Sequence, residues 1–535
     1  MKLLFACMTS LTLGLSACAN TLSASLTSEP ELPKAEVQSE AIEAHIRFLA
    51  DDIMEGRAAG ERGYDLAAAY VESQYRIIGL EPGGSDGYRQ PVPLKTLTPI
   101  TSQAQFILNG EDLEPGPDFF VTTSAVHSQS RISGELVFAG YGHVAEQYGL
   151  DAYAGLDVDG KIVVLIAGAP EGVPSDVAAH LSSPQTRSLA AAERGAVGLV
   201  YLAPEGLTRW HYDRLQSFFA QPSMTTPASD RSSGLEATAY LSDTIAHRLF
   251  EGAERSFDDI LEAAHNGEAL QGFDLGHEVT IAQATQSDDF FDDNVVAVLP
   301  GTDPELADEP VIVTAHLDHI GICRMDDAED AICNGALDNA SGTAIMLETA
   351  RVMAANGAPR RPVVFVALAA EERGLLGSAH IAQNPTPAMT GMVANINLDM
   401  PVIRYEFNDL IGFGAEHSTL GPIAEAAAMA RGASLTPDPL PEQALFTRSD
   451  HYNFVREGVP SLFLMTGFSS PNPDDDDGQG FLRFLGGDYH APGDEVDQVL
   501  FDQGAKFAEI NLAIIEAVAN AEETPRWNAD SFFNR

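Results

Sequence analysis

Residues 363–382 read VVFVALAAEERGLLGSAHIA, and this stretch carries the signal that decides the fold. Its apolar first part shows no polar alternation, which is typical of a strand buried on both faces of a parallel sheet. Similar Val- and Ile-rich runs occur at 294–301, 309–319 and 391–400, and a helical run follows at 341–357. The alternation predicts an α/β domain with a mixed, mostly parallel sheet flanked by helices.

Acidic and histidine side chains stand at or just after the ends of these runs, or in the segments that connect them. They are His316, Asp338, Glu371, Glu372, Asp399 and His490. Each alone has a plain explanation, such as a polar surface residue, a helix cap, a turn residue or an acid in the first turn of a helix. In parallel sheets, however, ligands bind beyond the carboxyl ends of the strands, where these side chains would meet.

Taken together, the six side chains offer only oxygen and nitrogen ligands. That chemistry suits zinc, with manganese or cobalt as substitutes, in a hydrolytic site. A carboxylate such as Asp338 has two oxygens and can bridge two metal ions. His316, Asp399, Glu372 and His490 then supply two further ligands for each ion, which leaves Glu371 available as a base.

The motifs around these residues resemble a known family. AHLDHIG, ALDNASGTA, ALAAEERGLLGS, NINLDM, RSDHYNF and YHAPGDE follow the order found in dizinc exopeptidases of the bacterial leucyl aminopeptidase type. The runs VFAGYG and AERGAVGLVYL resemble the protease-associated domain inserted in larger relatives. The resemblance implies the zinc exopeptidase fold, which is phosphorylase/hydrolase-like.

The resemblance also implies a role for each residue. His316 and Asp399 are expected to hold one Zn²⁺, Glu372 and His490 the other, and Asp338 to bridge them. Glu371 is expected to be the general base, and Asp318 to orient the His316 ring. Asp450 is expected near the site, whereas His319 and His451 are not expected to be ligands. The Asp338–Asn339 peptide is expected to be cis.

The implied activity is removal of N-terminal residues from peptides, with a water activated between two zinc ions and Glu371 as the base. A carboxypeptidase or dipeptidase on the same scaffold stays open, and arginines in the pocket would favour it; Arg324 and Arg448 are the nearest candidates. A glutaminyl cyclase is disfavoured by the full dizinc set. A non-catalytic binding protein is disfavoured because every ligand position is filled.

The patterns divide the chain into five segments. Residues 1–18 resemble a signal peptide with a lipobox, and residues 19–38 resemble a flexible tether. Residues 39–130 are expected to begin the peptidase domain, with helices between 40 and 80 and a helix end at Gly79. Residues 131–280 are expected to form the protease-associated insertion. Residues 281–525 are expected to form the catalytic dizinc domain.

The N-terminal pattern predicts export. Lys2, an apolar run and the sequence Leu15-Ser16-Ala17-Cys18 predict a lipoprotein of the periplasm or outer membrane, with Cys18 as the lipid anchor; the alternative is an ordinary signal peptide. Cys323 and Cys333 then either pair as a disulfide or stay free thiols.

The charge of the chain restricts its partners. Its 78 acidic and 30 basic residues give a formal net charge of −48, which repels nucleic acid and anionic lipid. Contact with a membrane is therefore expected only through the lipid anchor. Peptides with a free N-terminus are the expected substrates, and the sequence does not fix the oligomeric state.

Overall fold

The computed structural model describes residues 34–208, 210–229, 234–323 and 330–534. The predicted signal peptide, its lipobox and most of the predicted tether lie outside these residues. Within the part of the chain that is described, no helix combines the length and the apolar content needed to cross a bilayer.

Two helices open the predicted peptidase domain, as the apolar spacing indicates. α1 (Ser39–Leu49) and α2 (Arg62–Ile78) each bury one apolar face. α2 ends at Gly79, whose φ of 89° lies in the left-handed region that glycine adopts without steric cost. Between the helices, the chain forms η1 (Asp52–Arg57), in which residues 55–57 also have positive φ.

The predicted peptidase domain is built on a mixed sheet with parallel central strands, which confirms the predicted fold class. Its strands are β1 (Glu81–Pro82), β2 (Arg89–Pro99), β11 (Ser223–Thr225), β13 (Phe273–Leu299), β14 (Val311–His316), β17 (Val363–Leu368), β18 (Ala394–Asn397), β19 (Asp409–Phe413), β20 (Ser434–Thr436) and β21 (Ser461–Thr466). β17, β14, β18 and β21 lie side by side in parallel. β13 flanks β17 and β19 flanks β21, both antiparallel.

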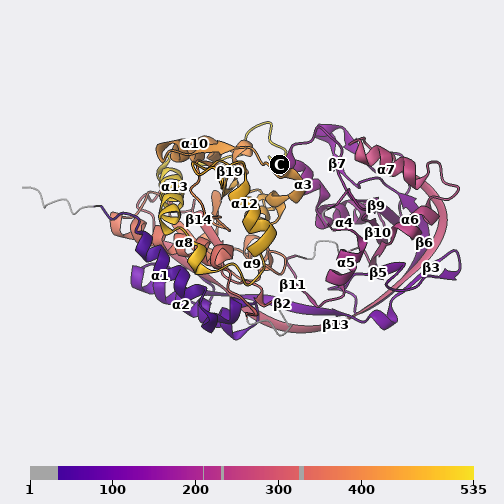
Figure 1. The fold of residues 1–535 in the computed structure, drawn as a ribbon, viewed down its shortest axis with the longest axis horizontal. Helices are drawn as coiled ribbons and strands as arrows, with labels where there is room; N and C mark the ends of the chain where they lie inside the picture. The colour runs from indigo at the N-terminus through magenta and orange to yellow at the C-terminus, as the bar shows by residue number, and fades with distance from the viewer. Residues whose placement is uncertain (1–33, 209, 230–233, 324–329, 535) are drawn as a thin grey trace, which may run out of the picture. The chain divides into compact units, whose positions relative to one another are not determined.

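Helices cover both faces of this sheet. They are α8 (Ser341–Asn356), α9 (Leu376–Gln383), α10 (Leu420–Ala430), α11 (His451–Arg456), α12 (Gln479–Arg483) and α13 (Phe501–Asn520). On one face, Val313 and Phe365 share a core with α1, α8 and α13, which pack together (Figure 1). On the other face, Ile312 packs with Ile381 of α9 and Phe454 of α11. The sheet is therefore buried on both faces, as its continuous apolar strands predict.

Residues 105–272, apart from β11, and the first part of β13 form an inserted α/β module with its own hydrophobic cores. The strands of its main sheet are β3 (Gln105–Leu108), β4 (Glu111–Asp112), β5 (Phe119–Val121), β6 (Gln129–Phe138), β9 (Ile162–Ile166), β10 (Gly198–Leu202) and β12 (Ala237–Leu241), and β7 (Val144–Ala145) and β8 (Leu150–Asp151) form a separate pair. Its helices are α3 (Ser175–Ser182), α4 (Pro184–Ala192), α5 (Tyr212–Phe219), α6 (Asp243–Leu249) and α7 (Phe257–His265). β6, β9, β10 and β12 are parallel neighbours. The identification of this module as a protease-associated domain stays a prediction.

The module begins earlier than the boundary predicted at residue 131. β3 pairs with β13 and β5 pairs with β12, so both strands belong to the sheet of the module. Phe106 and Phe119 are buried in the same core. These pairings join segments more than a hundred residues apart, and no local pattern in the sequence marks them.

β13 joins the two sheets as one continuous strand (Figure 1). Its first part pairs with β3 and β6 in the module, and its last part pairs with β17 in the peptidase sheet. Between them it pairs antiparallel with β2, from Thr285 opposite Pro99 to Val295 opposite Arg89. The predicted boundary at residue 280 therefore falls inside a strand.

A disulfide joins Cys323 and Cys333, with a Cα–Cα distance of 5.7 Å. It closes the short hairpin of β15 (Gly321–Ile322) and β16 (Ile332–Cys333). Of the two alternatives that the sequence leaves open for these cysteines, the structure contains the paired one.

Candidate metal centre

The ends of three neighbouring parallel strands carry most of the predicted site residues. His316 is the last residue of β14, and Asp399 lies two residues after β18. Glu371 and Glu372 follow β17 after a turn in which Ala370 has a φ of 54°. Because the chain leaves its extended conformation there, both glutamates can point toward the same site, which successive residues of a regular strand cannot do.

Asp338 and His490 reach this site from loops. Asp338 lies in a turn of π-type helix, Ala336–Ala340, directly before α8, and His490 follows a similar turn, Phe484–Asp488. The Asp338–Asn339 peptide is cis, which confirms the expectation drawn from the family resemblance.

Among the described residues, these side chains form two ligand clusters that meet at Asp338. His316 Nε2 lies 3.2 Å from Asp338 Oδ1 and 3.0 Å from Asp399 Oδ1. His490 Nε2 lies 3.2 Å from Asp338 Oδ2 and 3.0 Å from Glu372 Oε2. Two ligands of a tetrahedral zinc ion lie about 3.3–3.4 Å apart. The donor set and its spacing therefore fit two ions that share Asp338.

The electrostatics of the two clusters also suit cations. Burial opposes ionisation of Asp338, but hydrogen bonds with His316 and His490 outweigh it and hold the Asp338 pKa well below its usual value. Burial opposes protonation of His490, but Glu372 and Asp338 raise its pKa to about 10. Burial also opposes protonation of His316, but Asp399 and Glu371 raise its pKa well above its usual value, so both imidazoles carry protons without metal. Metal binding would replace these protons, so affinity should rise with pH.

Glu371 borders a small cavity but stands back from the ligand contacts. Its Oε2 lies 3.9 Å from His316 Nε2, and its side chain is 10% exposed. Burial, reinforced by Asp399 and Glu372, raises the pKa of Glu371 well above its usual value. The cavity measures about 30 Å³, and its lining also includes Arg448 and Tyr489. A buried carboxyl group with a raised pKa next to a cavity is suited to accept a proton.

Asp318 contacts the site differently from the expectation. Its carboxylate accepts hydrogen bonds from the backbone N–H groups of Glu371 and Glu372, at 2.9 and 3.2 Å. His316 Nδ1 lies 3.1 Å from the backbone carbonyl oxygen of Asp318 and 3.9 Å from its carboxylate. Asp318 therefore positions the two glutamates with its side chain, and it contacts the His316 ring through its backbone.

His319 lies closer to the site than expected. Its Nδ1 is 2.6 Å from Glu372 Oε1, and together with Asp338 and Glu372 it forms a group with metal-ligand spacing. His451 and Asp450 are both fully buried. Burial lowers the pKa of His451 to about 3 and raises that of Asp450 to about 7.

Three residues that support the site were missed from the sequence. Asp494 accepts the N–H groups of Leu337 and Asp338, at 2.9 and 3.0 Å, much as Asp318 does for the glutamates. Ser449 donates a short hydrogen bond to Asp399 Oδ2. Asp494 lies in the motif YHAPGDE and Ser449 in the motif RSDHYNF, so their position within these motifs is the signal that could have identified them.

The third missed residue is Arg57, which is 1% exposed. Its guanidinium donates to the carbonyls of Leu49, Leu317, Asn334 and Gly335, at 2.5, 3.0, 2.6 and 3.1 Å. Leu317 follows the candidate ligand His316, and Gly335 lies three residues before the candidate ligand Asp338. Arg57 thus fastens the N-terminal helices to two of the ligand-bearing loops.

Comparisons with known proteins agree with this geometry. Residues 294–515 match the model of the family described as "Peptidase family M28". A "Probable zinc metalloprotease" of Pyrenophora teres f. teres is 42% identical over 106 residues, which are 20% of this chain and 22% of the relative. "Aminopeptidase YwaD" of Bacillus subtilis is 26% identical over 228 residues, covering 40% of this chain and 42% of the relative. The chain thus spans less than half the length of either curated relative.

A solved structure shares the fold over most of the chain. It is an aminopeptidase from Aneurinibacillus sp. strain AM-1, with a TM-score of 0.51 and 20% identity. The match covers 91% of this chain and 96% of that one.

Proposed function

We propose that this chain is a zinc aminopeptidase that removes N-terminal residues from peptides, because residues 294–515 match the model of peptidase family M28. The observation that carries the proposal is the pair of ligand clusters that share Asp338 and leave Glu371 outside both. The printed names of the curated and structural relatives support the zinc and the exopeptidase class.

The proposed ligands form two sets, one for each of two zinc ions. His316 and Asp399 would hold one ion, Glu372 and His490 would hold the other, and Asp338 would be shared by both. Asp318 and Asp494 fix the backbone on which these ligands stand. Such supporting hydrogen bonds orient metal ligands and strengthen their binding.

When bound, zinc supplies Lewis acidity that polarises a carbonyl and makes a water easier to deprotonate. Glu371 accepts the proton of the attacking water and later gives it to the leaving amine. Burial raises the pKa of Glu371 above its usual value, which strengthens the group as a proton acceptor. The carboxylates of the site attract the positively charged α-amino group of the substrate.

A panel of substrates tests the class of peptidase. Aminoacyl-nitroanilides, N-blocked peptides and peptides with a C-terminal reporter are compared with and without a chelator. We expect cleavage only where the α-amine is free, and loss of cleavage on chelation. Equal cleavage of N-blocked peptides would contradict the aminopeptidase assignment.

The adjacent glutamates offer a matched pair of variants. Glu371→Gln should keep the wild-type zinc content and lose about 10²–10⁴-fold in kcat, the usual contribution of a general base. Glu372→Gln should lose zinc as well as activity. Retained turnover in Glu371→Gln would show that another group is the base.

One observation favours a carboxypeptidase as the second candidate. Arg448 lines the cavity, where its Nη2 lies 3.2 Å from the Tyr489 hydroxyl, and a guanidinium there could hold a substrate carboxylate. Arg324, the other arginine considered, lies outside the described residues. If the C-terminal reporter is released and Arg448→Met abolishes that release, this second candidate replaces the first.

We also propose that the protein is exported and lipidated on Cys18. The Cys323–Cys333 disulfide supports an oxidising compartment. Cys18→Ala should abolish incorporation of labelled palmitate and release the protein from the membrane fraction. Unchanged labelling would overturn the assignment of the lipid anchor.

A further inference from the structure

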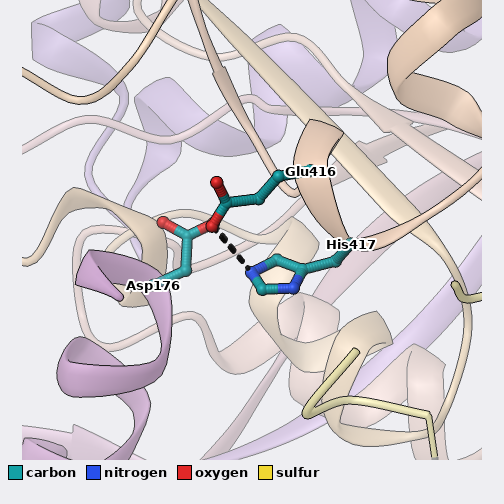
Figure 2. A group of neighbouring side chains, drawn as sticks. All are labelled: Asp176, Glu416 and His417. Carbon is teal, nitrogen blue, oxygen red and sulfur yellow. Dashed lines mark ion pairs between the residues drawn. The ribbon is translucent and has the colours of Figure 1, made fainter. Parts of the chain in front are cut away.

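A separate group of metal-ligating side chains consists of Asp176, Glu416 and His417 (Figure 2). Asp176 lies in the first turn of α3 in the inserted module. Glu416 and His417 lie in the short helix η6 (Ala415–His417), which follows β19 of the peptidase domain. One nitrogen or oxygen atom of each side chain lies within 4.8 Å of the others.

The His417 ring supplies the observation that points to a ligand. Its side chain is 8% exposed, and Nδ1 lies 3.3 Å from Ser531 Oγ. The other nitrogen, Nε2, is buried and has no hydrogen-bond partner among the described residues. Buried ring nitrogens are nearly always paired, so a group that occupies this one is expected.

The spacing of the group fits a shared ion better than direct hydrogen bonds. His417 Nε2 lies 3.5 Å from Asp176 Oδ2 and 3.4 Å from Glu416 Oε1, as Figure 2 shows for the ring and the carboxylates that face it. Charge-assisted hydrogen bonds are shorter, about 2.7–2.9 Å. Two ligands of a tetrahedral zinc ion lie about 3.3–3.4 Å apart.

The chemistry of the donor atoms and of their surroundings also fits a bound zinc ion. One imidazole and two carboxylates form a ligand set that zinc uses in proteins, with water completing the shell. Ser531 contacts the far nitrogen of the ring, and the Gly414 N–H donates to Asp176 Oδ2 at 3.3 Å, so both buried ligands are held in orientation. Glu416 is 63% exposed on its side chain, which gives an ion a path from solvent.

We propose that Asp176, Glu416 and His417 bind a third zinc ion, which ties α3 of the inserted module to the peptidase domain. Its ligands come from both parts of the chain, so it acts as a structural link. Neighbouring contacts already join the same elements: the Tyr452 hydroxyl of α11 lies 2.9 Å from His180 Nδ1 of α3. The ion would hold the module in place without entering the peptidase reaction.

Zinc content of the full-length protein tests the proposal. After chelation, reloading with zinc and removal of the excess, elemental analysis should find one zinc fewer per chain in His417→Gln than in the wild type. With a two-ion peptidase centre, the expected counts are three for the wild type and two for this variant. The difference of one does not depend on that centre, so its failure and a failure of the proposed function can be told apart.

Further variants keep the test independent of folding. Asp338→Ala, which removes the bridging ligand of the peptidase centre, should still bind one zinc at this group. Glu416→Gln alters an exposed side chain and should weaken binding of this ion at least tenfold. Glu442→Gln, which removes the same charge at an exposed position outside the group, should bind as the wild type does.

Thermal unfolding gives a second readout. Zinc added to Asp338→Ala should raise its Tm, and it should raise the Tm of Asp338→Ala combined with Glu416→Gln much less. Wild-type zinc content and an unchanged zinc response in both the His417 and Glu416 variants would overturn the proposal.

Discussion

Replacing Arg57 should destabilise the peptidase domain before any substrate or metal is involved. The fully buried guanidinium satisfies the carbonyls of Leu49, Leu317, Asn334 and Gly335. Methionine fills a similar volume but donates nothing, so Arg57→Met leaves these buried carbonyls without their donor. The positive charge that faces Asp494, Asp318, Asp338 and Glu372 is lost as well.

The size of the loss follows from the hydrogen bonds. A bond from a charged donor contributes about 1.5–3 kcal/mol, but bonds made by one group are not additive. Breaking a buried charged network typically costs about 3–5 kcal/mol, and we expect this range for Arg57→Met. Lysine keeps the charge but cannot spread its donors over carbonyls that lie on several segments. Arg57→Lys should therefore lose about 1.5–3 kcal/mol.

Urea unfolding of the chelated protein at pH 7 measures these losses as shifts of the midpoint at unchanged slope. Arg62→Met is the matched control, because this arginine is 66% exposed and makes only a loose ion pair with Glu55 at 3.6 Å. The control should stay within about 0.5 kcal/mol of the wild type. If Arg57→Met unfolds within about 1 kcal/mol of the control, the assigned role of Arg57 is wrong.

Three further changes probe other parts of the molecule. Asp338→Ala should lose both ions of the peptidase centre, and elemental analysis that still finds both would contradict the bridging role. Gly56→Ala should cost about 2–4 kcal/mol, because φ is 67° and a Cβ would lie 2.5 Å from the Cys333 carbonyl oxygen; an unchanged Tm would argue against this contact. Asp292→Asn should change the pH dependence of stability. Burial raises the pKa of Asp292 to about 7, so the folded state holds a proton that the unfolded state releases near pH 4. Wild-type stability should therefore fall as the pH rises from 5 to 8. The free energy of unfolding of the variant should fall by roughly 2 kcal/mol less over this range. Equal pH profiles of the variant and the wild type in urea unfolding would refute the role of Asp292.

The gathering of the candidate ligand residues at one place was predictable because their signal is local. Continuous apolar runs locate β14, β17 and β18, and the side chains that follow them must gather at one edge of the sheet. His316, Asp399 and Glu372 are therefore found from strand ends alone. The assignment of Glu371 and Glu372 to different roles rested on the ligand count and on the family resemblance, because the separation of their side chains depends on the turn at Ala370.

The supporting residues were not predictable in the same way. Arg57 stands in a segment that reads as the end of a helix, and its carbonyl partners are brought to it by tertiary folding. The group of Asp176, Glu416 and His417 joins residues about 240 positions apart without a spacing motif. The start of the inserted module was placed too late because β3 and β5 find their partners only across the whole module.

The pairing of β2 with β13 has a consequence for how the module could have been acquired. These antiparallel neighbours form the two arms of a hairpin, and residues 100–284 occupy the position of its turn. The two ends of the module leave from facing residues, Pro99 and Thr285, so a short turn could reconnect the arms. The entropic cost of closing a loop grows only with the logarithm of its length. A domain in place of a short turn therefore destabilises the sheet only slightly. The connection at Pro99 and Thr285 is therefore the place where the module could be exchanged for a turn or another domain. Grafts or deletions should be made at these two residues.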